Sequence, residues 1–547
     1  MGNSKVNKNN AKNKSDVWYK VLAVVIGVVL LFGLGVAIMQ PTGIMDFITL
    51  HTQTAMKTEN FSVNNAQFMY LTHLTYNNYY QTIYESYGST YLSAFGLDRS
   101  KPLSQQAYYG SSTTSWLDAC VTEVRSSLTQ TLALCEAAKA AGFELTDKDK
   151  AQAEESIQAL KDFAKANNYT VTSAIAAMYG SKGIKKSDIK SMIEMQLLAA
   201  NYAQSISDSY TYTDEQYNKY YDDNKLDFMK VDYYSYEVKA DYESNAEDDV
   251  KEAAISAAKN KAEELHKKIE DGADFVTVIM EYKKELAQAE VDAAQKAYDD
   301  AVAEGKIDTT AEEKSTEEKA LDNAKKALED ITEESVKKSV LTTAHTTSTS
   351  ATKSEAEEWM FADTPAQDNA TKLIEADESA TVYQIVKSAY RDEYNTVTIR
   401  ELDLSLDNFT SPEAMKEYAE GIIADFNASS EKTGDAFDKL AEKYTTEKIT
   451  VTSKGQIKET TKSSSTNEEI QAVNEWLFSD ERKSGDIKYF VFTDEGLSIY
   501  FFEETGRAAW LVSVDSAMRS KDLTSAIEGF EKTYPITVNE KAIASIE

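Results

Sequence analysis

The stretch YTYTDEQYNKYYDDNKLDFMKVDYYSYEV, residues 210–238, changes its pattern near the middle. Its first half is polar with helical spacing, and from Met229 onward apolar and polar residues alternate as in a half-buried strand. Thr213 and Gln216 have the spacing of a capping box, in which both side chains satisfy backbone N–H groups at a helix start. We therefore expect a helix that leads directly into a strand, and this boundary separates two kinds of sequence.

Residues 59–229, on the amino-terminal side, read as a series of helices, with apolar residues at steps of three and four. The only two cysteines, Cys120 and Cys135, lie on one long amphipathic helix in this segment. Their separation of 15 residues corresponds to ~22 Å along a helix, whereas the Cα atoms of a disulfide lie within ~7 Å. We expect two buried free thiols and no disulfide between them.

Tyrosine is dense near the start of this helical segment. Five of these residues are Tyr70, Tyr76, Tyr80, Tyr84 and Tyr87. Their rings either form a core with polar tips or present an amphipathic surface on which unfolded polypeptides dock, and the pattern does not separate the two possibilities. We take the five as candidate binding residues for unfolded proteins, called clients below.

The sequence beyond Met229 contains an internal repeat. Seven residue pairs stand 117 positions apart without a gap: Glu358/Glu475, Trp359/Trp476, Phe361/Phe478, Asp363/Asp480, Asp377/Asp494, Glu378/Glu495 and Tyr383/Tyr500. Farther upstream, Gly272, Phe275 and Tyr282 match Gly434, Phe437 and Tyr444 at an offset of 162. The first copy therefore carries 45 additional residues, and residues 283–345 have the composition of a helical hairpin. Each copy otherwise reads as a small α+β unit.

Composition and motifs exclude several functional classes. The net charge of −33 argues against nucleic acid as a partner, because phosphate binding needs clustered Lys and Arg. The sequence contains no H-E-x-x-H, C-x-x-C, G-x-S-x-G or P-loop pattern, and its four histidines are scattered. We expect no cofactor and no metal site.

Residues 21–39, VLAVVIGVVLLFGLGVAIM, are 19 uncharged residues, close to the ~20 that a helix needs to cross a bilayer. Five lysines and one acidic residue precede this run, so the positive-inside rule keeps the amino terminus in the cytoplasm and the rest outside. A cleaved signal peptide is the alternative, although the run is long for one and no A-x-A-like site follows it. We expect an uncleaved membrane anchor.

Several segments resemble the SurA/PrsA-type extracytoplasmic foldases, which join a helical chaperone module to parvulin-type prolyl isomerase domains. LALCEAAKAAGFELTDKD at 132–149 and the junction at 210–238 are similar to the helical module. GDAFDKLAEKYTTE at 434–447 resembles the parvulin G-x-x-F-x-x-L-A-x-x-Y-S helix, and KSGDIKYFVFTDEGLSIYFF at 483–502 resembles the end of that domain. The resemblance implies a protein that binds unfolded secreted proteins.

The positions of the parvulin pocket depart from the family. The resemblance implies one histidine in the first strand and another near the last strand, but the aligned positions hold Ser235 or Glu401 and Thr381 or Ser498. Isomerisation requires a dry pocket that lowers a rotation barrier of ~18–20 kcal/mol, and a glutamate brings charge and water. We therefore expect parvulin-like domains without isomerase activity and no confident catalytic residue.

The sequence as a whole predicts an α+β multidomain protein with an N-terminal transmembrane helix. The expected segments are 1–20 cytoplasmic tail, 21–39 anchor, 40–58 linker, 59–229 all-helical chaperone module, 230–394 first parvulin-like domain with its hairpin at 283–345, 395–514 second parvulin-like domain and 515–547 a C-terminal helix returning to the helical module. We expect a membrane-anchored chaperone on the outer face of the cell membrane of a Gram-positive-type bacterium. Two alternatives stay open, namely an active peptidyl-prolyl cis–trans isomerase with an atypical pocket and a structural subunit of a surface or secretion assembly.

Overall fold

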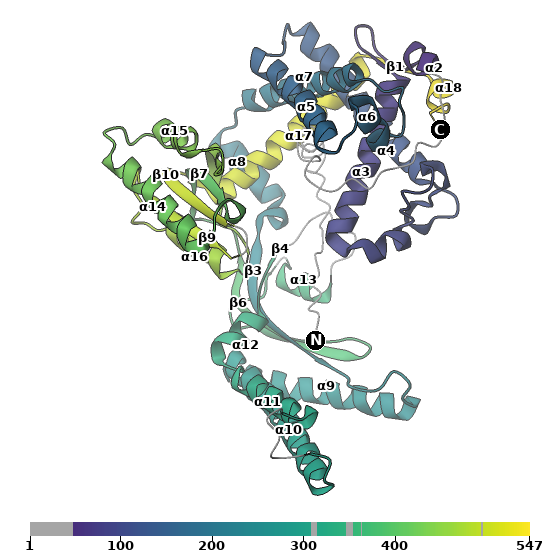
Figure 1. The fold of residues 1–547 in the computed structure, drawn as a ribbon. Coiled ribbons are helices and arrows are strands. Elements are labelled where there is room, and N and C mark those ends of the chain that lie inside the picture. Colours follow the sequence, from purple (N-terminus) through teal and green to yellow (C-terminus); the bar gives the residue numbers. More distant parts are fainter. Residues whose placement is uncertain are drawn as a thin grey trace. The chain divides into compact units, whose positions relative to one another are not determined.

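The computed structural model describes residues 47–307, 314–345, 354–362, 364–465, 467–493 and 496–546. These residues form a mixed α+β structure with three small antiparallel sheets (Figure 1). They divide into two compact units. One unit is Asp214–Val514, and the other, called the helical unit below, combines the described residues before Asp214 with those from Asp515 onward.

Helices dominate the helical unit. They are α2 (Phe47–Thr52), α3 (Asn65–Tyr87), α4 (Trp116–Ala140), α5 (Asp147–Ala166), α6 (Val171–Tyr179), α7 (Lys186–Ser209), the part of α17 (Ala509–Thr533) from Asp515 onward, and α18 (Glu540–Ile543). Capping boxes begin three of them, at Asn64, Ser115 and Thr146, where each side chain satisfies a backbone N–H that the helix leaves unpaired. Leu523 and Ile527 of α17 pack into the same core as Phe68 and Leu132.

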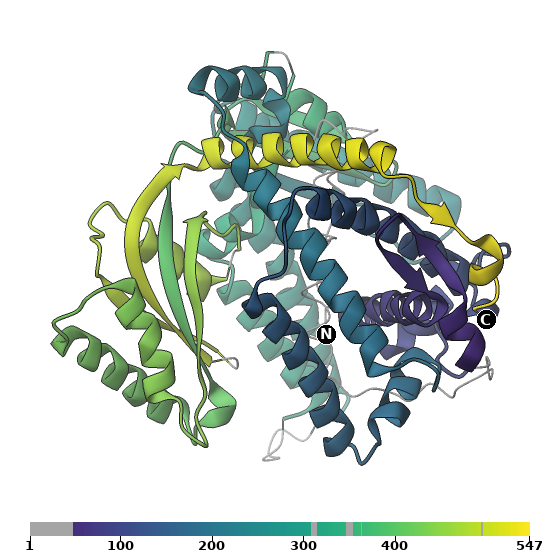
Figure 2. The same ribbon diagram turned by 90° about the horizontal axis from the view of Figure 1, so that it is seen from above.

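The helical unit also contains a sheet of three short strands, β1 (Thr54–Lys57), β2 (Ser62–Asn64) and β11 (Thr537–Val538), in the order β11-β1-β2. Met56 pairs with Val538, so residues from the two ends of the described chain meet in one sheet. Figure 2 shows the yellow strand β11 beside the purple strands β1 and β2. The expectation of an all-helical module is therefore wrong. Strands of two to four residues are too short to show an alternating pattern, and the β1–β11 pairing is not local in sequence.

The transmembrane helix of the predicted fold class is not part of the structure that is described. Within the described ranges, no helix is both long enough and apolar enough to cross a membrane. The predicted anchor at 21–39 lies outside the described residues.

The unit Asp214–Val514 begins with α8 (Asp214–Asp223), directly after Thr213, as the capping pattern predicts. A short 3-10 helix, η4 (Lys225–Phe228), leads into the first strand of a four-stranded sheet with the order β4-β3-β6-β5. Its strands are β3 (Lys230–Lys239), β4 (Leu341–His345), β5 (Thr371–Glu375) and β6 (Ser379–Tyr390). The associated helices are α9 (Asp248–Glu270), α10 (Phe275–Ala303), α11 (Thr316–Glu329), α12 (Glu333–Val340) and α13 (Glu355–Met360).

The second four-stranded sheet of this unit has the order β8-β7-β10-β9. Its strands are β7 (Asn395–Ser405), β8 (Val451–Thr460), β9 (Ile487–Phe492) and β10 (Gly496–Ala508), and its helices are α14 (Pro412–Ala428), α15 (Gly434–Tyr444) and α16 (Glu468–Leu477). In chain order, both sheets place the second strand beside the first, the first beside the fourth and the fourth beside the third. The repeated sequence therefore forms two sheets of the same topology.

The additional residues of the first copy extend an existing helix. Phe275 and Ile279 at the start of α10 pack against the first sheet, and the same helix then continues to Ala303. Helix α11 packs beside it, and Val291 of α10 and Leu321 of α11 are buried. The predicted helical hairpin is thus present, with α10 as its first arm.

Candidate functional site

The five tyrosines proposed as client-binding residues all lie on α3, but their exposure differs. Tyr70 and Tyr76 are fully buried, Tyr80 is half-buried, and Tyr84 and Tyr87 are 47% and 56% exposed. Tyr70 packs edge-on against Tyr179, with ring centroids 4.8 Å apart. Tyr70 and Tyr76 therefore belong to the core, and their assignment to client binding is wrong because a folded chain cannot present them. Tyr84 and Tyr87 remain candidates.

We define the aromatic patch as Tyr84 and Tyr87, which lie one turn apart on α3, together with Tyr91, Phe95 and Tyr109. The ring of Tyr87 lies 6.3 Å from that of Tyr91 and 5.3 Å from that of Phe95, and Phe95 lies 5.4 Å from Tyr109. Four of the eight large apolar side chains that are exposed in the described residues belong to this patch. Such a concentration is typical of an interaction surface.

A small separate core supports the aromatic patch. It is formed by Tyr76, Ile83, Leu92, Leu97, Leu103, Trp116 and Cys120. The Trp116 ring is fully buried and contacts the ring of Tyr109, with centroids 5.5 Å apart. Its indole N–H donates to the carbonyl oxygen of Phe95 at 3.0 Å. The patch is thus held on a packed base rather than on a loose loop.

Gln106 fixes the segment before α4 that includes Tyr109 of the aromatic patch. This side chain is 2% exposed, and its Oε1 accepts the hydroxyl of Tyr76 at 2.8 Å and the backbone N–H of Asp98 at 3.0 Å. Its Nε2 donates to the carbonyl oxygen of Lys101 at 2.8 Å. Both the oxygen and the nitrogen of this buried amide therefore have hydrogen-bond partners, as is usual for buried polar groups. Gly96 lies against Ala107, where a Cβ atom would come within 1.8 Å of the carbonyl oxygen.

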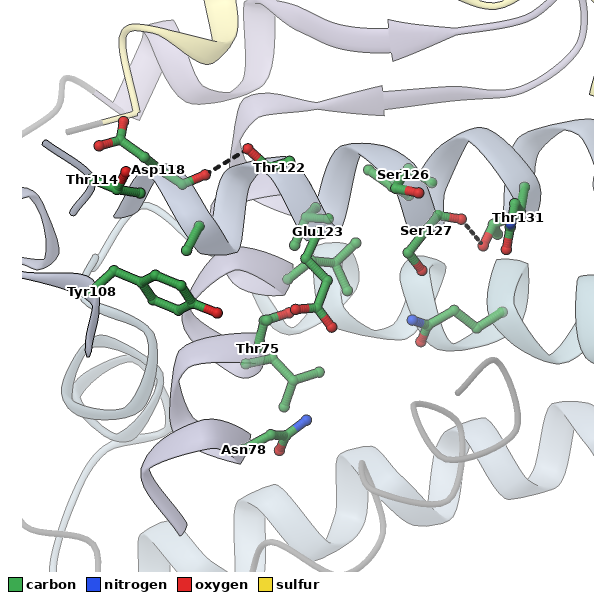
Figure 3. Close-up of a pocket in the computed structure, with 17 residues that line it drawn as sticks. Thr75, Asn78, Tyr108, Thr114, Asp118, Thr122, Glu123, Ser126, Ser127 and Thr131 are labelled. Carbon is green, nitrogen blue, oxygen red and sulfur yellow. Dashed lines mark hydrogen bonds between the residues drawn. The ribbon is translucent and has the colours of Figure 1, made fainter. Parts of the chain in front are cut away.

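A cleft of about 620 Å³ lies beside this region, between α3 and α4 (Figure 3). Seventeen residues line it, and Tyr108 connects it to the patch because its ring contacts that of Tyr109 at 4.7 Å. Figure 3 shows the side chains of Tyr108 and Glu123 directed into the space between the two helices. The hydroxyl of Tyr79 donates to Glu123 Oε2 at 2.7 Å, and burial together with this carboxylate raises the pKa of Tyr79.

The candidate isomerase positions of the first sheet come together on one face. Ser235 of β3 pairs with Tyr383 of β6, and Thr381 pairs with Glu237. Paired residues of antiparallel strands point to the same side, and residues two apart on a strand share a face, so Ser235 and Thr381 are neighbours across the strand pair. Burial raises the pKa of Tyr383, so this hydroxyl stays protonated.

The second sheet repeats this arrangement with Glu401 and Ser498. Glu401 of β7 pairs with Tyr500 of β10, and Ser498 pairs with Asp403, to which its hydroxyl donates at 2.6 Å. Glu401 and Ser498 are each 7% exposed. The Nζ of Lys454 lies 2.9 Å from carboxylate oxygens of both Glu401 and Asp403. The four positions that sequence alignment selected therefore occupy equivalent places in two sheets.

Charged neighbours make the candidate isomerase positions of the second sheet, Glu401 and Ser498, strongly polar. Burial lowers the pKa of Lys454, but its hydrogen bonds to Asp403 and Glu401 outweigh burial and raise the pKa overall, so the ammonium stays charged. Burial and the neighbouring Glu401 carboxylate raise the pKa of Tyr500. A buried carboxylate with a cationic partner is unlike the dry pocket that stabilises a twisted amide. Neither sheet carries a histidine at these positions.

In the described part of the chain, no group of three or more His, Cys, Asp or Glu side chains is arranged to hold a metal ion. No family model matches this chain, and no curated protein matches it.

Sequence reasoning missed the part of the aromatic patch that lies beyond α3. Phe95 and Tyr109 come from two short 3-10 helices between α3 and α4, and only the fold brings Phe95 beside Tyr87 and Tyr109 beside Phe95. The available signal was composition, because Tyr108, Tyr109 and Trp116 follow the tyrosine-rich helix within 30 residues. Composition alone does not show which of these rings are exposed.

Proposed function

We propose that this chain is an extracytoplasmic chaperone that holds partly unfolded secreted proteins, and that the aromatic patch is its main client-binding surface. The observation that carries the proposal is the exposure of Tyr84, Tyr87, Tyr91 and Tyr109, at 47–56% each, on one small, well-packed base. Broad aromatic surface accepts many sequences, because tyrosine rings offer apolar faces and a polar tip at low entropic cost.

Charge supports the same proposal. The net charge of −33 keeps an apolar surface in solution by self-repulsion and attracts clients with basic segments. The resemblance of residues 132–149 and 210–238 to the helical module of SurA/PrsA-type foldases also favours a chaperone. The location outside the cytoplasm is proposed from the sequence alone, from the lysines that precede an apolar run.

In this proposal, the two repeated sheets belong to parvulin-like domains that bind clients but do not isomerise their prolyl bonds. The support is the chemistry at Glu401, which is buried, ion-paired with Lys454 and adjacent to Tyr500. Catalysis of prolyl rotation uses a pocket complementary to a twisted, uncharged amide, and a fixed ion pair does not provide one.

Suppression of aggregation tests the chaperone proposal. The purified full-length chain is mixed with a thermally unfolding test protein, and light scattering is followed. A patch variant replaces Tyr84, Tyr87, Tyr91 and Tyr109 with serine. A matched control replaces with serine the four other large apolar residues that are exposed in the described part of the chain, namely Val250, Leu286, Leu341 and Val386.

We expect wild type and the control to suppress scattering and the patch variant to lose most of this effect. Circular dichroism of both variants checks that they fold. Equal suppression by the patch variant would refute the assignment of binding to the patch, and absence of suppression by wild type would refute the chaperone proposal.

A further inference from the structure

We infer that the cleft between α3 and α4 takes a short client segment in which an aliphatic side chain is flanked by lysine or arginine. The inference rests on the proposed chaperone function and names the class of segment that this site prefers. Three properties of the cleft support the inference: an apolar floor, a buried hydrogen-bond acceptor without a partner in the described residues, and a rim whose only formal charges are negative.

The floor of the cleft is aliphatic. Leu71 and Leu74 come from α3, and Val124 and Leu128 come from α4, and each is at most 6% exposed. The volume of about 620 Å³ lies within the ~300–1,000 Å³ that is typical of pockets for small ligands. A cleft of this size with branched aliphatic walls suits one or two leucine-like side chains of a peptide rather than a folded domain.

Gln196 of α7 supplies the second observation. Its side chain lines the cleft and is 7% exposed, and its Oε1 is buried without a hydrogen-bond partner in the described residues. A buried acceptor without a donor is costly, so such atoms in folded proteins normally have a partner. A backbone N–H of a bound peptide would satisfy this oxygen.

The rim of the cleft selects for positive charge. Asp118 and Glu123 line it, both are exposed, and none of the 17 described lining residues is Lys, Arg or His. Asp118 accepts hydrogen bonds from Ser115, and this lowers the pKa of its carboxyl group, so it is ionised at neutral pH. Cationic side chains on either side of the apolar segment would therefore gain favourable interactions, and these weaken at high salt.

Peptide binding to the full-length chain tests the inference. Three fluorescein-labelled peptides are compared by anisotropy at low and high salt. Their central sequences are Lys-Leu-Leu-Lys, Glu-Leu-Leu-Glu and Lys-Ser-Ser-Lys. We expect the first to bind about tenfold more tightly than either of the others at low salt, and this preference over the acidic peptide to shrink at high salt. Equal affinity for the three peptides would overturn the inference.

Two variants tie binding to the cleft. Gln196→Leu should weaken binding of the Lys-Leu-Leu-Lys peptide about 3- to 10-fold, the loss expected for one hydrogen bond. The matched control is Gln204→Leu, on the same helix but on its exposed side, and it should leave binding unchanged. Ser127→Trp should fill the cleft and abolish peptide binding. Retention of wild-type affinity by Ser127→Trp would place the peptide elsewhere and refute the inference.

Failure of the inference differs from failure of the proposed function. If wild type suppresses aggregation but binds the three peptides equally, the chaperone proposal stands and the cleft preference is refuted. If wild type does not suppress aggregation, the chaperone proposal itself fails.

Discussion

The indole N–H of Trp116 donates a hydrogen bond of 3.0 Å to the carbonyl oxygen of Phe95. This bond joins the first residue of α4 to the end of η1 (Ser89–Phe95), so it attaches the aromatic patch, which includes Phe95, to α4. The Trp116 ring is also part of the small core beneath the patch. Stability of the helical unit and geometry of the patch therefore depend on the same side chain.

Trp116→Ala should lower the free energy of unfolding by about 3–5 kcal/mol, because it removes a fully buried ring and leaves a cavity. Trp116→Phe keeps a ring but loses the bond to Phe95, and it should cost less. Urea unfolding followed by circular dichroism measures both. Wild-type stability of Trp116→Ala would show that the small core does not contribute to the fold.

Gly434→Ala should destabilise the second repeated domain by about 1–3 kcal/mol. A Cβ atom there would lie 2.2 Å from Arg400 Nε and 2.1 Å from Glu503 Oε1, so it would disturb the ion pairs of Arg400 with Glu503 and Asp438. Gly421→Ala is the matched control, because a Cβ atom at this position of α14 meets nothing within 4 Å. It should be neutral or stabilising by up to ~1 kcal/mol. Equal effects of the two changes in thermal unfolding would contradict the steric argument.

Both cysteines should be unreactive in the folded protein. Burial raises the pKa of Cys120 and of Cys135 to about 12, so neither forms a thiolate at neutral pH, and both are free and buried. A chromogenic disulfide reagent should detect no thiol in native protein and two in urea. Rapid labelling of native protein would show that α4 opens far more readily than its packing implies.

His73 should make the helical unit less stable in mild acid. Burial lowers the pKa of His73 to about 4, whereas an unfolded histidine has a pKa near 6.5. At pH 7 both states are mostly neutral, and as the pH falls through 6.5 the unfolded state binds the proton while the folded state stays neutral until the pH approaches 4. The free energy of unfolding therefore falls, by about 2 kcal/mol at pH 5 and about 3 kcal/mol at pH 4.

The matched variant for this effect is His73→Gln, which removes the titrating group. Unfolding of wild type and variant in urea at pH 7 and pH 5 gives the difference, since the carboxylates contribute to both proteins alike. If the free energy of unfolding of wild type falls between pH 7 and pH 5 by no more than that of the variant, the buried imidazole is accessible to protons.

The two repeated domains should not accelerate prolyl isomerisation. With the full-length chain present, an X-Pro peptide should still isomerise over the uncatalysed tens to hundreds of seconds. The measurement is a protease-coupled or NMR exchange assay. A clear acceleration that Glu401→Ala or Ser235→Ala abolishes would replace the binding role of these domains with an enzymatic one.

Long periodic segments were predictable from the sequence. The spacing around Cys120 and Cys135 predicted one long helix, and α4 contains both residues as buried free thiols. The start of α8 after Thr213 and the hairpin arms α10 and α11 also followed from capping and composition. These features are local, so neighbouring residues contain the information needed.

Short and non-local strands were not predictable. β11 has two residues and pairs with β1 from the opposite end of the described chain, and β4 has five residues of mixed polarity. The second strand of the second repeat, β8, has little sequence signal for a related reason. β8 alternates exposed and half-buried residues at a sheet edge, so few apolar residues mark it.

The candidate site was predictable only in part. Tyr70, Tyr76, Tyr84 and Tyr87 lie on one helix, and the sequence gives no sign that the first two are buried and the last two exposed. Tyr70 lies in the main core and Tyr76 in the small core around Trp116, whereas Tyr84 and Tyr87, near the end of α3, belong to neither core. The cleft acceptor Gln196 has no sequence signature at all.

Binding of a permanently unfolded client tests the central claim most directly. A fluorescently labelled protein whose disulfides have been reduced and blocked is titrated with the full-length chain, with the patch variant (Tyr84, Tyr87, Tyr91 and Tyr109 to serine) and with the control variant (Val250, Leu286, Leu341 and Val386 to serine). We expect wild type and control to bind with the same Kd and the patch variant to bind at least about tenfold more weakly, a loss of ~1.4 kcal/mol or more. A patch variant that folds normally and binds the unfolded client as tightly as wild type would show that the aromatic patch is not the client-binding surface.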